Sequence, residues 1–143
     1  FLPIPDDDRF VYTEKLIQDI KGFDNAYFVP KTYSRKVIKE ALKNFAIGII
    51  PYDTSFDFNR YCYPMKLFEY FYMGKPVIST PIDELSRFPK FVKIGENAIE
   101  WEKIISSLLS KKWPQNYRIE QKKLSEENSW EKKINTVISL VDW

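Results

Sequence analysis

The chain of 143 residues has no histidine, one cysteine and no long hydrophobic run. Without histidine it has no His-based metal site and no histidine general base. The lone Cys62 excludes an internal disulfide and fits a reducing compartment. No apolar run approaches the roughly 20 residues that cross a bilayer. The net charge of +2 gives no broad electrostatic attraction to nucleic acid. These absences favour a cytoplasmic protein that does not bind nucleic acid.

The amino-acid composition of the chain suits a folded protein with a hydrophobic core. Hydrophobic residues make up 44% of the chain and aromatic residues 17%, so residues 1–143 are expected to form one domain. The first residue is Phe1 rather than Met, and no signal-peptide pattern follows it. We therefore expect this sequence to be a fragment of a longer protein.

Short apolar segments alternate with stretches of helical periodicity. Strands are expected at residues 1–4, 26–29, 46–50, 76–80 and 91–94. The segment 46–50 is apolar without alternation, which is typical of a parallel strand covered on both faces. Helices are expected between these strands, with a polar and aromatic loop at 51–63 and two further helices at about 115–127 and 129–141. The pattern predicts an α/β fold, in which a Rossmann-like parallel sheet has helices on both faces and a helical C-terminal tail follows.

The run from Pro64 to Thr80 is the most informative segment. Pro64 suits the first turn of a helix, Gly74 suits its C-terminal stop, and Lys75-Pro76 leads into an apolar strand. A helical projection places Leu67, Phe68, Phe71 and Tyr72 on one arc, with Lys66 and Glu69 opposite. Two interpretations stay open. The charged residues form an exposed ion pair of little energetic value, or Lys66 meets a phosphate while Glu69 accepts hydrogen bonds from ribose hydroxyls.

The segments "GIIPY" and "YPMKLFEYFYMGKPVIST" resemble the C-terminal domain of GT-B glycosyltransferases. The likeness is greatest to a retaining group with the signature Pro-x-Lys-x-x-Glu-Tyr, followed by Gly-Lys-Pro-Val. The segment "NAYFVPKTYSRKVIKEALKNFAIGIIPY" is similar to the strand, helix and strand before the donor loop, and "NSWEKKINTVISL" is similar to the final helix. The resemblance covers nearly the whole chain.

This resemblance implies the donor-binding half of a two-domain enzyme that moves a sugar from a nucleotide-sugar to an acceptor. Glu69 matches the acid that binds the donor ribose. Pro64, Met65, Lys66 and Leu67 match the loop and helix start that face the diphosphate, with Lys66 as its charge partner. No metal and no further cofactor are expected, and no catalytic residue is assigned. The expected partners are the nucleotide-sugar donor and an N-terminal domain of the same protein.

The sequence departs from the family pattern in two places. Tyr61 stands where many retaining members have a second Glu, eight positions before the ribose-binding acid. The first strand and helix of the family's domain, which usually carry a basic residue for the diphosphate, also have no counterpart before Phe1. We therefore expect this fragment alone to be inactive as a transferase.

The weaker candidates for ligand-binding residues also have a purely structural interpretation. Arg60 could hold phosphate, or it packs over an aromatic ring or faces solvent. The Lys122-Lys123 and Lys132-Lys133 pairs suit solvated helix faces, and they also permit a peripheral contact with an anionic membrane in the full-length protein. The alternative function is a non-catalytic nucleotide-binding or interaction module with a Rossmann-like fold.

Overall fold

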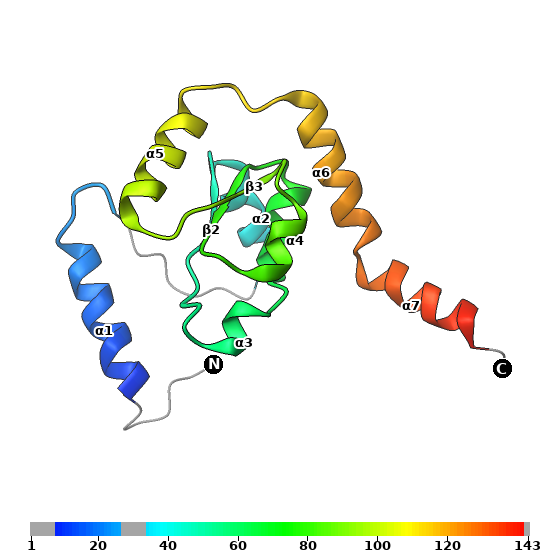
Figure 1. Ribbon diagram of the computed structural model, residues 1–143, viewed down its shortest axis with the longest axis horizontal. Coiled ribbons are helices and arrows are strands. Elements are labelled where there is room, and N and C mark those ends of the chain that lie inside the picture. Colours follow the sequence, from blue (N-terminus) through cyan, green and yellow to red (C-terminus); the bar gives the residue numbers. More distant parts are fainter. Residues whose placement is uncertain (1–7, 27–33, 142–143) are drawn as a thin grey trace. The chain divides into compact units, whose positions relative to one another are not determined.

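A computed structural model describes residues 8–26 and 34–141, and the chain forms two compact units, Phe1–Ile38 and Lys39–Trp143 (Figure 1). In the first unit, α1 (Asp8–Lys21) ends just before Gly22. Helix α2 (Arg35–Lys43) begins in the first unit and ends in the second. The strand expected at residues 1–4 and nearly all of the strand expected at 26–29 lie outside the described residues. A single domain over residues 1–143 stays a prediction.

The second unit is built on a parallel sheet. The strands β1 (Gly48–Ile50), β2 (Val77–Ser79) and β3 (Val92–Ile94) pair in chain order. Gly48 lies opposite Val77, and Val77 lies opposite Val92. The strands therefore end at one common carboxyl edge, which is where α/β folds hold their ligands.

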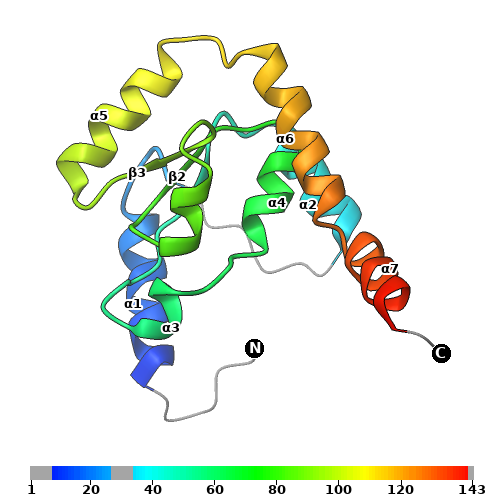
Figure 2. The same cartoon turned by 45° about the vertical axis from the view of Figure 1, so that its right-hand side comes forward.

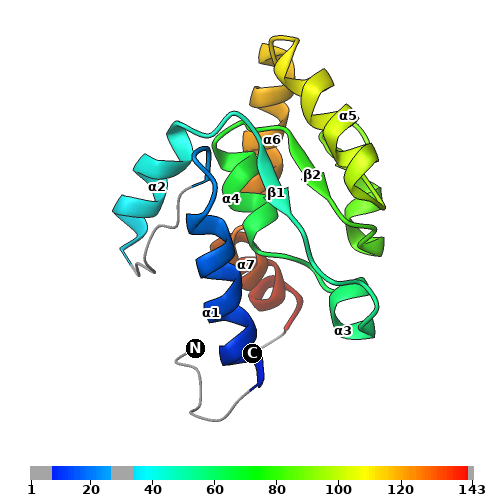
Figure 3. The same cartoon turned by 90° about the vertical axis from the view of Figure 1, so that its left-hand side faces the viewer.

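Helices cover both faces of this sheet. Helix α4 (Lys66–Tyr72) packs against β1, and α5 (Ala98–Leu109) packs against β2 from the opposite side (Figure 3). Helix α6 (Gln115–Glu127) lies along α4 (Figure 2). It is followed by α7 (Trp130–Leu140), and a 3₁₀ helix, η1 (Asp83–Arg87), lies between β2 and β3. The predicted α/β class, parallel sheet, two helical layers and helical C-terminal tail are confirmed.

The core lies between the sheet and α4. Phe71 is fully buried, and its ring meets those of Phe88 and Phe91 edge to face at 5.5 Å each. Full burial of a side chain of this size stabilises a fold by about 1.5–3 kcal/mol. The other apolar side chains that are at most 1% exposed are Ile50, Leu67, Val77, Ile78, Ile82 and Leu85.

Three details differ from the sequence-based expectation. The segment 51–63 is not all loop, because it contains the short helix α3 (Asp57–Arg60). Ile49 is 47% exposed, so burial on both faces does not hold for β1. On α4, Tyr70 is buried whereas Tyr72 is 43% exposed. The Tyr70 ring fits because Gly48 has no Cβ there, and its hydroxyl donates to the Ile49 carbonyl at 3.3 Å.

The connection from α4 to β2 is fixed by polar contacts. Gly74 adopts a φ of 61°, and a Cβ at this position would lie 2.9 Å from Cβ of Arg118. The Lys75 ammonium donates to the Lys43 carbonyl at 2.7 Å and so caps the end of α2. Burial, with the Arg118 charge as a smaller cause, lowers the pKa of Lys75.

Gln121 of α6 completes this connection. Its side chain is fully buried and donates to the Lys75 carbonyl at 2.7 Å. Its carbonyl oxygen accepts a hydrogen bond from the Trp113 indole at 2.8 Å. The Gly-Lys-Pro part of the run therefore has a structural role. Within the part of the chain that the structure describes, no helix is both long and apolar enough to cross a membrane.

Candidate functional site

The first turn of α4 is formed by the residues that the sequence analysis placed at the diphosphate. The Leu67 amide donates to the Pro64 carbonyl, and the Phe68 amide donates to the Met65 carbonyl, each at 3.1 Å. Pro64 is buried and Leu67 is completely buried, so the Leu67 side chain belongs to the core. Met65 and Lys66 are exposed. Of this group, only Met65 and Lys66 present side chains to solvent.

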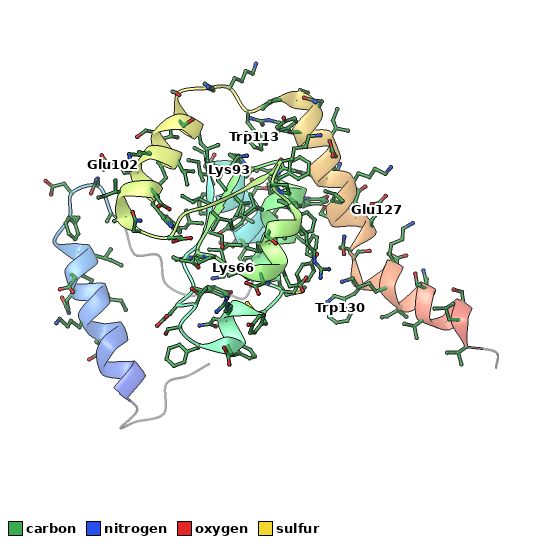
Figure 4. All side chains as sticks on the ribbon, viewed as in Figure 1. Lys66, Lys93, Glu102, Trp113, Glu127 and Trp130 are labelled. Carbon is green, nitrogen blue, oxygen red and sulfur yellow. The ribbon has the colours of Figure 1, made fainter. Side chains whose placement is uncertain are left out.

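Lys66 and Glu69 are both exposed on α4. Among the described residues the ion pairs include neither of them, so the predicted exposed pair between the two does not form. Lys66 Nζ instead lies 5.8 Å from the centre of the Tyr52 ring. Such a contact at an exposed site is worth about 0.5–1 kcal/mol and restrains the ammonium group. Figure 4 shows Lys66 at the end of α4 nearer α3.

Tyr52 is a residue that the sequence analysis missed. It follows β1 by two positions, and its backbone carbonyl accepts a hydrogen bond from Thr80 Oγ1 at 2.7 Å. Ser79 Oγ donates to the Ile50 carbonyl at 3.2 Å, so the carboxyl ends of β1 and β2 are joined twice. Burial, with the Cys62 thiol charge as a smaller cause, raises the pKa of Tyr52, so its hydroxyl stays protonated at neutral pH. Its place at the end of the segment "GIIPY", just past a strand, was the signal in the sequence.

Arg60 lies near the site but is already engaged. Its Nε is 3.7 Å from Oδ1 of Asp83, and its guanidinium carbon is 5.6 Å from the centre of the Tyr61 ring. The alternative in which Arg60 packs over an aromatic ring is therefore the one the structure contains. Tyr61, in the position where many retaining enzymes have an acid, is 59% exposed.

The loop between α3 and α4 is held by aromatic contacts. The Tyr63 ring lies 5.3 Å from that of Phe68 and 6.5 Å from that of Phe88, and Lys133 of α7 lies 5.7 Å from its centre. The Cys62 thiol donates to the Asn59 carbonyl at 3.1 Å, and burial raises its pKa. A thiol with a raised pKa is a poor nucleophile at neutral pH.

The site therefore consists of two exposed charged side chains on one helix, one of which rests on a tyrosine at a strand end. Such an arrangement can neutralise an anion and accept hydrogen bonds from neighbouring hydroxyls. Across the described ranges 8–26 and 34–141, no group of three or more Cys, Asp or Glu residues is placed to hold a metal ion.

Comparison with known proteins shows a distant similarity to a named enzyme. A protein of Bacillus subtilis (strain 168), named putative teichuronic acid biosynthesis glycosyltransferase TuaH, is 26% identical over 100 residues. The match covers 66% of this chain and 25% of that protein, so the chain spans about a quarter of the relative's length. No family model and no solved structure matches the chain. The similarity relates the chain distantly to a protein named as a glycosyltransferase.

Proposed function

We propose that this chain is the donor-binding part of a retaining GT-B glycosyltransferase, which moves a sugar from a nucleotide-sugar to an acceptor such as a glycan, a lipid-linked sugar or a polysaccharide precursor. The observation that carries the proposal is the exposure of Lys66 and Glu69 on one helix of a parallel α/β unit. The distant likeness to a named glycosyltransferase supports the reaction class. The GT-B architecture and the role in polysaccharide synthesis are part of this proposal.

In this proposal the two charged groups have separate tasks. The Lys66 ammonium binds the diphosphate and neutralises the negative charge that develops as the nucleoside diphosphate leaves. The Glu69 carboxylate accepts hydrogen bonds from the two ribose hydroxyls. Tyr52 restrains Lys66 through its ring. Met65 borders the diphosphate, whereas Pro64 and Leu67 shape the start of the helix, because their side chains are buried and the Leu67 amide already donates to the Pro64 carbonyl.

The proposed reaction needs no metal, because Lys66 supplies positive charge at the diphosphate. The chain itself is expected to bind donor without transferring sugar. In the family that it resembles, donor and acceptor are held by different domains, and this chain spans about a quarter of its relative.

The binding test compares diphosphates with nucleosides by titration calorimetry on the 143-residue chain. Lys66→Ala should weaken nucleoside diphosphate binding about tenfold or more and leave nucleoside binding nearly unchanged, since only the diphosphate carries negative charge. Lys103→Ala, which removes an exposed lysine of α5, is the matched control and should leave both affinities unchanged. Equal losses for both ligands in Lys66→Ala would contradict the phosphate assignment.

The alternative, a non-catalytic nucleotide-binding or interaction module, makes the same binding prediction but a different catalytic one. The full-length protein incubated with a panel of nucleotide-sugars and saccharide acceptors should release nucleoside diphosphate as sugar is transferred. If the full-length protein binds nucleoside diphosphate but transfers no sugar to any acceptor, the non-catalytic module is the correct interpretation.

A cytoplasmic location with peripheral membrane contact is also proposed. The supporting observation is α7, where Trp130, Ile134, Val137 and Ile138 are each more than half exposed, next to Lys132 and Lys133 (Trp130 is labelled in Figure 4). An amphipathic helix with basic residues beside an apolar stripe can bind at an anionic membrane surface. Sedimentation with vesicles should show binding to anionic but not to neutral lipid, and equal sedimentation with both would contradict the proposal.

A further inference from the structure

A cavity lies at the carboxyl edge of the sheet, beside α5. Its volume is about 620 Å³, within the range of roughly 300–1,000 Å³ that small-molecule sites occupy. Its lining includes Pro51 after β1, Thr80 after β2, and Trp101 and Ile105 of α5. Neither Lys66 nor Glu69 lines it. The cavity is therefore a feature separate from the exposed surface of α4.

The aromatic wall of this cavity is fixed in place. Trp101 Nε1 donates to the Gly95 carbonyl at 2.9 Å, which sets the orientation of the indole. A Cβ on Gly95 would lie 2.5 Å from the indole ring, so the close approach of Trp101 depends on glycine. The indole remains partly exposed. It is thus a preorganised apolar platform, and a ligand need not order it on binding.

The N-terminus of α5 borders the cavity, and its capping groups are bonded to one another. Asn97 Oδ1 accepts a hydrogen bond from the Glu100 amide at 3.0 Å. The Glu100 carboxylate in turn accepts from the Glu96 amide at 2.9 Å and from Asn97 Nδ2 at 3.1 Å. These donors are already used. Because Glu96 and Glu102 are also among the lining residues, their negative charge would repel an anionic ligand.

We propose that this cavity binds a neutral pyranose ring. Such a ring has an apolar C–H face, which suits the Trp101, Pro51 and Ile105 surfaces, and hydroxyl groups around its edge. The carboxylates of Glu96 and Glu102 accept hydrogen bonds from those hydroxyls, and charge-assisted bonds of this kind are strong. The same carboxylates disfavour a uronic acid, so the cavity selects uncharged sugars.

The cavity is connected to the Lys66 site through the strand ends. Pro51 lines the cavity and the next residue, Tyr52, lies beneath Lys66. Thr80, also in the lining, donates to the Tyr52 carbonyl at 2.7 Å. Both sites therefore border the carboxyl edge of the sheet, the Lys66 site on the side of α4 and the cavity on the side of α5. The choice of a saccharide rests on the proposed function, and its source is either the donor sugar or the acceptor.

The test uses the indole N–H signals in nitrogen–proton correlation spectra of the 143-residue chain. Methyl glucoside and methyl N-acetylglucosaminide are titrated to about 100 mM, a range that detects dissociation constants above 1 mM. Trp101→Phe identifies the Trp101 signal by its loss. Neutral glycosides should shift the indole N–H signal of Trp101. The signal of Trp113, whose indole donates to Gln121, should not change (Trp113 and Glu102 are labelled in Figure 4).

Methyl glucuronide should bind about fivefold more weakly than methyl glucoside, because its carboxylate meets like charge. Glu96→Gln combined with Glu102→Gln should abolish this difference. The inference would be overturned if neither neutral glycoside shifted the Trp101 indole signal. It would also be overturned if methyl glucuronide bound as tightly as methyl glucoside.

A titration with uridine and guanosine diphosphates on the same sample separates this inference from the proposed function. Diphosphate binding that depends on Lys66, without a glycoside effect on Trp101, would overturn only the saccharide subsite. Glycoside binding without diphosphate binding would overturn only the donor proposal. Where both bind, a larger Trp101 shift with uridine diphosphate glucose than with uridine diphosphate assigns the subsite to the donor sugar, and equal shifts assign it to the acceptor.

Discussion

The two ends of α4 differ in how their polar groups are used. At the C-terminal end, Gly74, Lys75 and the buried Gln121 are all engaged by neighbouring backbone or side chains. At the N-terminal end, Lys66 and Glu69 are exposed, and their charges are not neutralised by any ion pair among the described residues. One contiguous run of sequence therefore contains a part that holds the fold together and a part that is available to a ligand.

This difference shows how the resemblance to an enzyme family should be interpreted. A signature such as Pro-x-Lys-x-x-Glu-Tyr with Gly-Lys-Pro-Val gives all of its positions equal weight. Here Lys75 caps a helix and Tyr70 fills the space beside Gly48. These residues are explained by packing, and only Lys66 and Glu69 lack a structural explanation. Substitutions at the two ends should therefore affect different properties.

The largest expected effect is loss of stability in Gln121→Leu. Leucine has a similar volume but leaves the Trp113 indole N–H and the Lys75 carbonyl without their partner. Two unsatisfied groups in a buried position should cost about 2–4 kcal/mol in the free energy of unfolding. Urea denaturation measures this loss, and Gln115→Leu at the exposed start of α6 is the control. If both variants are equally stable, the C-terminal end of α4 is not fixed as described.

A smaller loss is expected for Gly74→Ala. Alanine is strained at a φ of 61°, and its Cβ would also press on Arg118, so about 1–2 kcal/mol of stability should be lost. Gly22→Ala is the matched control, because its new Cβ would lie 3.3 Å from a single backbone oxygen. The comparison uses the same denaturation experiment. A variant of Gly74 that unfolds at the wild-type urea concentration would count against a strained turn.

At the other end of α4, Lys66→Ala and Glu69→Ala should leave the free energy of unfolding within about 1 kcal/mol of the wild-type value, and Lys66→Ala should lose more because it removes the contact with the Tyr52 ring. Both side chains are exposed, and their removal leaves no buried group without a partner. Thermal unfolding checks this expectation. A loss as large as that in Gln121→Leu would show that these residues serve the fold and would remove the distinction between the two ends.

The smallest effect concerns Cys62. Because burial raises the pKa of its thiol, less thiolate is present at pH 8 in the folded chain than in the unfolded chain. Alkylation by iodoacetamide should therefore be slower in buffer than in concentrated urea, as followed by mass spectrometry. Equal rates in the two solvents would mean that the loop before α4 does not shield this thiol.

Much of the fold was predictable because its signals are local. Gly74 marks the end of a helix by its backbone conformation, and it lies where the sequence placed it. The apolar segments that became β1, β2 and β3 were likewise visible in the sequence. The expectations that were wrong concerned side chains whose burial depends on neighbours that are distant in sequence. Tyr70 is buried because Gly48 leaves room for its ring, and a helical projection of α4 alone cannot show this.

The candidate site was predictable in part. Lys66 and Glu69 were found by their place opposite the apolar arc, and the structure confirms that both are exposed. Tyr52 was missed because a cation over a ring joins residues from two elements. Similarly, α7 has an apolar stripe of helical periodicity, yet Trp130 of this stripe is 68% exposed, whereas α6, with few apolar residues, packs on α4. Periodicity indicates an apolar side of a helix but not what covers it.

The central claim is that Glu69 binds the donor ribose. The most direct measurement compares a nucleoside diphosphate with its 2′,3′-dideoxy analogue, using calorimetry on the wild-type chain and on Glu69→Ala. The wild-type chain should lose about tenfold in affinity when the ribose hydroxyls are removed, whereas Glu69→Ala should lose less than about twofold. If the two chains lose affinity for the dideoxy analogue by the same factor, Glu69 does not contact the ribose and the proposed donor site is wrong.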